Sequence, residues 1–104
     1  MSEFEYAADL AELEATGLLG VWVEDTAVLL SLVDGEVHAI NDICSHAHAH
    51  LSDGERHGPQ VECLLHGARF DLRTGRHLCA PAYVDVDHYE VKVEDGKIYV
   101  RLED

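Results

Sequence analysis

Apolar and polar side chains alternate over short runs through much of the chain, which is the pattern of half-buried β-strands. The alternation is cleanest at residues 97–102, where every second side chain is apolar. Two Asp-Gly pairs, at 34–35 and 95–96, divide β-prone runs and favour tight hairpin turns. We therefore predict one hairpin over residues 28–40 and another over residues 89–102.

Only one stretch has the spacing of a helix. Between Asp9 and Ala15, the side chains of Leu10 and Leu13 fall on one face and predict a short helix. A further turn is expected at Thr74-Gly75.

The segment from Asn41 to Pro59 is polar, rich in histidine, and has neither a strand period nor a helix period. We interpret it as a long loop without regular structure, and such loops in compact domains usually have a function. The prediction is an all-β fold, a sandwich of antiparallel sheets with a small subdomain at about residues 42–81. Its turns are expected to use three glycines, Gly54, Gly67 and Gly75.

The length of 104 residues predicts a single domain, 1–104. No apolar run reaches the roughly 18 residues of a membrane span, so no transmembrane helix is expected. The N-terminal residues are acidic and lack the basic start and apolar centre of a signal peptide, which predicts a cytoplasmic protein. Three cysteines are an odd number, and they are interpreted as thiols or metal ligands instead of a disulfide framework.

Charge is the strongest compositional signal. Seven Lys and Arg stand against 21 Asp and Glu, which gives a formal net charge of −14. Such a surface repels nucleic acids and anionic membranes, so neither is expected as a partner. It would accelerate encounter with basic patches on proteins, although acidity can also serve solubility alone. Charge therefore excludes some partners without selecting a function.

Two short pairs carry the chemistry, Cys44-Ser-His46 and Cys63-Leu-Leu-His66. Together they supply two sulfur and two nitrogen ligands. This set suits either one tetrahedral zinc ion or an iron–sulfur cluster in which each iron takes two protein ligands. The spacing alone leaves both open.

The sequence around the pairs narrows the choice. Residues 44–54 (CSHAHAHLSDG) and 63–75 (CLLHGARFDLRTG), followed by Pro81-Ala82, resemble Rieske proteins. They look most like the small Rieske ferredoxins of bacterial aromatic-ring-hydroxylating dioxygenases. The resemblance implies one [2Fe–2S] cluster per chain, bound through four residues. Cys44 and Cys63 would bind the inner iron, and His46 and His66 the outer iron.

Comparison with high-potential Rieske proteins predicts a low reduction potential. Those proteins carry an extra cysteine in each loop, and the matching positions here are Ala49 and Leu65. They also use a serine and a tyrosine to donate hydrogen bonds to cluster sulfurs, where this chain has Ala68 and Phe70. Fewer donors leave negative charge on sulfur less stabilised, and this lowers the potential.

The function implied by the resemblance is one-electron transfer. A flavin-containing reductase would take electrons from NADH or NADPH and pass them singly to this chain. The chain would deliver them to a terminal oxygenase, and would not itself be an enzyme. We expect it to be a monomer.

Three alternatives remain at this point. The chain could be a small Rieske subunit of a nitrite-reductase-like system, a structural zinc-binding module that mediates protein contacts, or a redox or iron sensor. The second would be colourless and redox-silent, and no basic patch for nucleic acid supports the third.

Some residues depart from the family pattern or have no assigned role. Leu64 replaces a proline that is common after the second cysteine, so that loop is expected to be less rigid. Cys79 is expected to be a small buried hydrophobe, and His48 and His50 to be loop-surface residues. Four aromatic residues are expected to pack in the β core: Trp22, Tyr83, Tyr89 and Tyr99.

Overall fold

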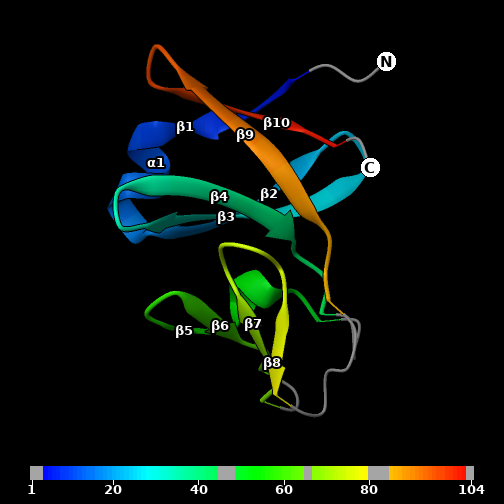
Figure 1. Cartoon of the computed structure of the whole chain (residues 1–104). Helices are drawn as coiled ribbons and strands as arrows, with labels where there is room; N and C mark the ends of the chain where they lie inside the picture. Colours follow the sequence, from blue (N-terminus) through cyan, green and yellow to red (C-terminus); the bar gives the residue numbers. More distant parts are fainter. Residues whose placement is uncertain (1–3, 45–48, 65–66, 80–84, 103–104) are drawn as a thin grey trace.

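The computed structural model describes residues 4–44, 49–64, 67–79 and 85–102, and this part of the chain forms two antiparallel sheets. Figure 1 shows the larger sheet above the smaller one. In chain order the elements are β1 (Glu5–Asp9), α1 (Leu10–Thr16), β2 (Leu18–Val23), β3 (Thr26–Val33), β4 (Glu36–Asn41), the 3₁₀ turn η1 (Leu51–Asp53), β5 (Glu55–His57), β6 (Gln60–Glu62), β7 (Arg69–Asp71), β8 (His77–Cys79), β9 (His88–Glu94) and β10 (Lys97–Arg101). Among these elements there is no helix with the length and apolar character to cross a membrane.

The larger sheet has the strand order β1-β10-β9-β4-β3-β2, and the smaller sheet has the order β5-β6-β7-β8. In the larger sheet the end strands β1 and β2 also contact each other, so the sheet curls toward a barrel. The smaller sheet comes entirely from the chain between β4 and β9, which pair with each other at Ala39 and Tyr89. The predicted all-β, antiparallel fold is confirmed, whereas the assignment of residues 1–104 to one domain stays a prediction.

Both predicted hairpins are present. Asp34 and Gly35 connect β3 to β4 with φ values of 52° and 82°, and Asp95 and Gly96 connect β9 to β10 with φ values of 54° and 74°. Positive φ at both central residues is the geometry that Asp-Gly favours, and its twist matches that of the flanking strands. A local signal was therefore sufficient to position four of the six strands in the larger sheet.

The predicted helix is also present and is shifted by one residue. Asp9 is its N-cap, and the backbone N–H of Asp9 donates to the side chain of Glu12 over 3.2 Å. The helix ends at Gly17, where φ is 78°. Leu13 is fully buried and Leu10 packs at the edge of the same core, as their spacing predicted.

The prediction of a structureless segment from Asn41 to Pro59 is wrong. It contains η1, β5 and an isolated bridge between Ile43 and His50. Strand β5 consists of polar residues with no apolar alternation, because it lies at the edge of the small sheet and is held by pairing with β6. A strand of this kind leaves no period in the sequence.

Two of the three predicted turn glycines adopt positive φ, 74° at Gly67 and 79° at Gly75. Gly54 is different, because its φ of −86° is accessible to any residue. A Cβ atom at Gly54 would overlap the carbonyl oxygen of Glu62. Glycine is required there for the close approach of two backbones instead of for a turn.

Two hydrophobic cores lie on the two sides of the larger sheet. The base core fills the curl of that sheet and includes Leu13, Val28 and Leu30. The joint core lies between the sheets and consists of Leu29, Val33, Ile40, Cys44, Leu51, Val61, Cys63, Ala68, Phe70, Leu72 and Val86. Successive residues of β3 therefore pack alternately into the two cores, because side chains along a strand point to opposite faces of the sheet.

Arg56 on β5 connects the sheets by hydrogen bonds. Its guanidinium donates to the carbonyl oxygen of Gly17, directly before β2, and to that of Leu32 on β3, each over 2.7 Å. Its Nε also donates to Gly58 within its own hairpin over 2.7 Å. Three directed bonds from one planar group fix the angle between the β5–β6 hairpin and the larger sheet.

Replacing Arg56 by methionine should keep the apolar stem and remove all three bonds. We expect the free energy of unfolding to fall by about 1–3 kcal/mol, because partly buried carbonyl groups lose their donor. Chemical denaturation would measure the change, with Arg76→Met, at an exposed arginine, as the matched control. Equal effects of the two substitutions would contradict this role for Arg56.

Candidate metal centre

Cys44 and Cys63 occupy equivalent places in two tight loops. The backbone N–H of Cys44 donates to the carbonyl of Ala49 over 2.9 Å, and that of Cys63 donates to the carbonyl of Ala68 over 2.7 Å. In both loops the bond joins a cysteine to the fifth residue after it. The two loops are therefore closed in the same way, although one follows β4 and the other follows β6.

Both cysteines are buried, with exposed fractions of 3% for Cys44 and 1% for Cys63. They belong to the joint core, where Leu51 and Phe70 are also fully buried. Neither cysteine forms a disulfide in the part of the chain that the structure describes. The structure thus brings two thiols together at the base of two loops.

The predicted nitrogen ligands, His46 and His66, lie outside the described residues. The same holds for Leu65, His48 and Tyr83, and for the side chain of Cys79. At the end of the second loop, Gly67 donates its N–H to the carbonyl of Cys63 over 3.1 Å. Leu64, the departure from the usual proline, is 66% exposed within that loop.

Asp42 anchors the first loop, and sequence analysis missed it. Its carboxylate is almost fully buried and accepts the N–H and the hydroxyl of Ser52, each over 2.7 Å. The ring Nδ1 of His50 lies 3.0 Å from the same carboxylate. The backbone N–H of Asp42 donates to the carbonyl oxygen of Ala27 on β3, and the carbonyl oxygen of Asp42 accepts the N–H of Leu51 at the start of η1. Asp42 therefore ties both ends of the Cys44 loop to the larger sheet.

A third segment, residues 80–84, lies outside the described residues, but its flanks are held together. His77 donates its backbone N–H to Asp85 over 3.0 Å, and its ring Nδ1 lies 2.6 Å from the same oxygen. These two bonds lower the pKa of the Asp85 carboxyl. The backbone N–H of Val86 donates to the carbonyl oxygen of Gly75 over 2.9 Å, and the Val86 side chain packs in the joint core.

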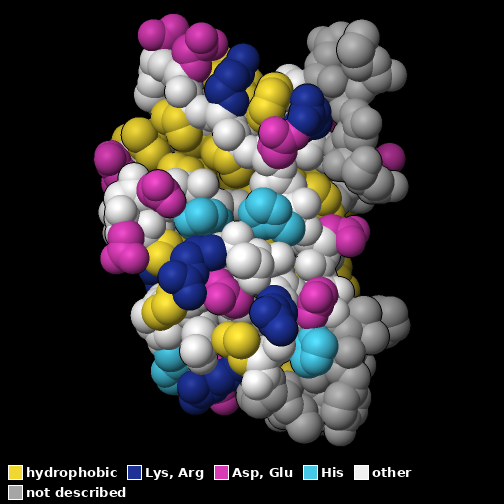
Figure 2. Space-filling model, in the orientation of Figure 1, with side chains coloured by type: hydrophobic (Ala, Val, Ile, Leu, Met, Phe, Trp, Pro, Cys, Tyr) yellow, Lys and Arg dark blue, Asp and Glu magenta, His cyan; other side chains and the backbone are white. Residues whose placement is uncertain are grey.

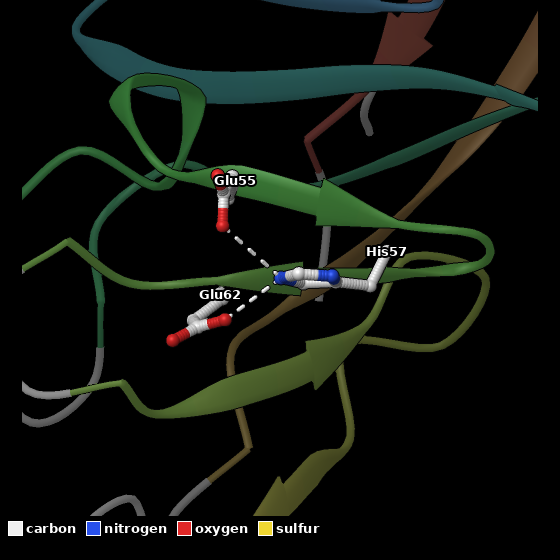
Figure 3. Close-up of side chains that lie close together, drawn as sticks. All are labelled: Glu55, His57 and Glu62. Atoms are coloured by element: carbon white, nitrogen blue, oxygen red, sulfur yellow. Dashed lines mark hydrogen bonds and ion pairs between the residues drawn. The ribbon is translucent and has the colours of Figure 1, made fainter.

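Three side chains of types that can bind a metal ion, Glu55, His57 and Glu62, lie close together on β5 and β6 (Figure 3). Glu55 and Glu62 are directly opposite in the strand register, and His57 Nε2 lies 3.4 Å from the first and 2.8 Å from the second. Arg69 adds a contact of 3.4 Å to Glu62. Arg69 supplies positive charge beside the two opposed carboxylates, and the His57 ring lies within ion-pair distance of both. The group has no sulfur donor and is not the predicted site.

The aromatic predictions had mixed outcomes. Tyr89 is buried as expected, with its hydroxyl accepting a bond from Asn41 over 3.0 Å, and Tyr99 is partly buried. Trp22 was predicted to pack in the core and is instead 64% exposed. It lies on the end strand of the sheet, beside His50, and the sequence pattern of β2 does not distinguish its two faces. The ring of His50, predicted to lie at the loop surface, is 38% exposed.

Residues 4–90 match the Rieske [2Fe–2S] domain family, and this stretch includes both loops. The chain belongs to the Rieske [2Fe–2S] family. This Rieske chain is 41% identical over 96 residues to the ferredoxin component of the naphthalene 1,2-dioxygenase system of Pseudomonas aeruginosa, which covers 92% of each chain. The predicted family is confirmed.

Solved structures agree with this assignment. The ferredoxin of Sphingomonas yanoikuyae B1 superposes with a TM-score of 0.90 at 29% identity, over 97% of this chain and all of that one. A chain from the complex of reduced oxygenase and oxidised ferredoxin in carbazole 1,9a-dioxygenase superposes with a TM-score of 0.85 at 27% identity, over 94% of this chain and 92% of that one. The relatives are named as ferredoxins, which are electron carriers and not enzymes.

Family membership implies one [2Fe–2S] cluster per chain, and the described residues fit it. Cys44 and Cys63 are thiols outside any disulfide, placed by equivalent loops in one apolar core. A Rieske cluster needs two thiolates from two segments, each followed closely by a histidine. The sequence supplies those histidines at positions 46 and 66.

Replacing Asp42 by alanine should loosen the first loop without touching a proposed ligand. We expect the cluster absorbance to bleach at a lower temperature, because Ser52 and His50 lose their shared acceptor, a change worth about 1–3 kcal/mol in stability. Asp42→Asn, which keeps one carbonyl acceptor, should have a smaller effect, and the exposed Asp25→Ala should have none. Bleaching of Asp42→Ala at the wild-type temperature would exclude the anchoring role.

Proposed function

We propose that this chain is the ferredoxin component of an aromatic-ring dioxygenase system and carries one electron at a time without catalysing a reaction. The observation that carries the proposal is the match with such ferredoxins over nearly the whole of both chains, together with two buried thiols in equivalent loops. The bound cluster would supply reversible one-electron exchange between ferric and ferrous iron.

We propose that Cys44, His46, Cys63 and His66 hold the cluster. The burial of both cysteines supports their assignment to the inner iron, because thiolates in the joint core lie away from water. The two histidines would bind the outer iron. Two thiolates and two sulfides balance two ferric ions, and neutral imidazoles leave that balance at zero, which makes reduction easier than in an all-cysteine cluster.

The surroundings of Cys63 support a low reduction potential. Ala68 and Phe70 are fully buried in the joint core and have no hydroxyl group to donate to a sulfur. These two apolar side chains exclude water but donate no hydrogen bond to added negative charge on sulfur. This favours the oxidised, neutral state.

The proposed partners are two proteins. A flavin-containing reductase that oxidises NADH or NADPH would reduce this chain, and a terminal oxygenase would receive the electron. A ferredoxin of similar structure is known in complex with the oxygenase of carbazole 1,9a-dioxygenase. We place the protein in the cytoplasm as a monomer.

Electron paramagnetic resonance of the reduced protein tests the cluster and its ligands. We expect a rhombic signal with a low average g, typical of mixed histidine and cysteine ligation. His46→Cys should keep a cluster but lower its potential, because a thiolate adds negative charge. His88→Cys, on the exposed face of β9, serves as the control and should leave the signal unchanged. A colourless protein that contains zinc would overturn the proposal.

The buried pair Ala68 and Phe70 tests the account of the potential. Ala68→Ser and Phe70→Tyr should each raise the midpoint potential toward the upper part of the Rieske range, which spans about −150 to +300 mV. The double variant should exceed either single variant, because each hydroxyl adds a donor. Voltammetry measures the potential, and Phe70→Leu controls for changes in packing. Potentials that do not move would contradict the hydrogen-bond account.

A further inference from the structure

Trp22 is one of the large apolar side chains that are exposed on the described surface. It is the only tryptophan in the sequence, and 64% of it is exposed. It lies on β2, which forms one end of the larger sheet. Its neighbour Val23 points into the base core with 2% exposure, so the alternation of the strand directs Trp22 to the opposite face.

That opposite face is the one that meets the Cys44 loop. Gly20 shares it with Trp22, two residues apart on β2. A Cβ atom at Gly20 would come within 2.5 Å of the Ser52 hydroxyl and 3.0 Å of the Asp42 carboxylate, so this part of β2 lies directly against the loop. Trp22 therefore stands at the margin of the joint between the sheets and not on a remote surface.

The ring of Trp22 contacts the ring of His50, at the end of the Cys44 loop. Its centroid lies 6.0 Å from that of His50, with the rings at 67° in an edge-to-face arrangement. His50 bonds Asp42, and its backbone bridges to Ile43, which precedes Cys44. A partner protein that covers Trp22 would therefore also lie against the loop that carries Cys44 and, in the proposed assignment, His46.

The described charged residues next to Trp22 in the chain, and the one at the end of η1, are acidic. Glu24 and Asp25 follow Trp22 in an exposed turn, and Asp53 is exposed at the end of η1, which contacts β2. No Lys or Arg precedes Arg56 in the sequence, so the first half of the chain offers only acidic charges and histidines. Figure 2 shows one face of the molecule, on which Lys and Arg side chains are spread among the acidic ones.

We propose that Trp22 is the apolar anchor by which this ferredoxin docks on its terminal oxygenase, in an apolar pocket bordered by Lys and Arg. The inference rests on the proposed function. An exposed tryptophan with a charged margin is typical of the few residues that dominate the free energy of an interface. The acidic margin fits a basic pocket edge, which favours encounter and fixes orientation. The position beside the Cys44 loop makes the docked face the one near the cluster.

The test measures binding of the oxidised holo-ferredoxin to the resting oxygenase of the Pseudomonas aeruginosa naphthalene 1,2-dioxygenase system. Trp22→Ala should raise the dissociation constant about 30-fold, because truncation of an anchor residue typically costs about 2 kcal/mol of binding free energy. Trp22→Phe keeps an aromatic ring and should raise it less. The loss should persist at high ionic strength. Glu24→Gln combined with Asp25→Asn should weaken binding at low ionic strength only.

The matched control is Tyr6→Ala, which removes a 51% exposed aromatic on β1, and it should leave binding unchanged. The reduction potential, the paramagnetic resonance signal and the unfolding temperature of Trp22→Ala should equal those of the wild type. A change in the signal would mean that Trp22 acts through His50 on the cluster loop, and would overturn the docking role.

Three other results would also overturn the inference. They are an unchanged dissociation constant for Trp22→Ala, slower reduction by the reductase with normal binding to the oxygenase, and a wild-type dimer in sedimentation that Trp22→Ala dissociates. Failure of the wild type itself to bind and reduce the oxygenase would instead overturn the proposed function, and this inference with it.

Discussion

The two thiols share one apolar core with the side chains that hold the sheets together. Ile40 of the larger sheet and Phe70 of the smaller one meet in the core that contains Cys44 and Cys63. The position of each sulfur therefore depends on the packing that joins the two halves, and a change of volume in this core acts on both loops at once. Protein interiors resist such changes, so the core supplies the rigidity that a redox centre needs when its charge changes.

Polar groups at the same joint add direction to this packing. Arg56 reaches from the smaller sheet to backbone carbonyl groups of the larger unit, and Asp42 holds the Cys44 loop and η1 against the larger sheet. Apolar contacts alone would permit the sheets to slide, because the hydrophobic effect has no direction. Hydrogen bonds to buried groups have strict geometry, and each bond that fails to form is costly. The guanidinium thus selects one orientation of the two sheets among those that the apolar core would allow, and the carboxylate fixes the first loop on the larger sheet.

The sequence predicted the features that depend on local chemistry. Asp34-Gly35 and Asp95-Gly96 specify their turns by themselves, and the Cys-X-His and Cys-X-X-His pairs identify the candidate centre. It did not predict features whose cause lies far along the chain. Asp42 is recognised as an anchor only when Ser52, ten residues later, folds onto it, and the position of Trp22 beside His50 brings together residues that are far apart in the sequence. Strand β5 was missed because pairing with β6, and not its own residues, makes it a strand.

The pairing of β4 with β9 encloses the whole small sheet between two neighbouring strands. The larger sheet therefore obtains all of its strands from the chain on either side of this insertion. The entropy of closing such a long loop grows only with the logarithm of its length, so gaining or losing a few residues within it changes the cost of closure by little. Evolution could therefore lengthen or reshape the loops around the centre, and so alter partner choice, while the register of the supporting sheet stayed the same.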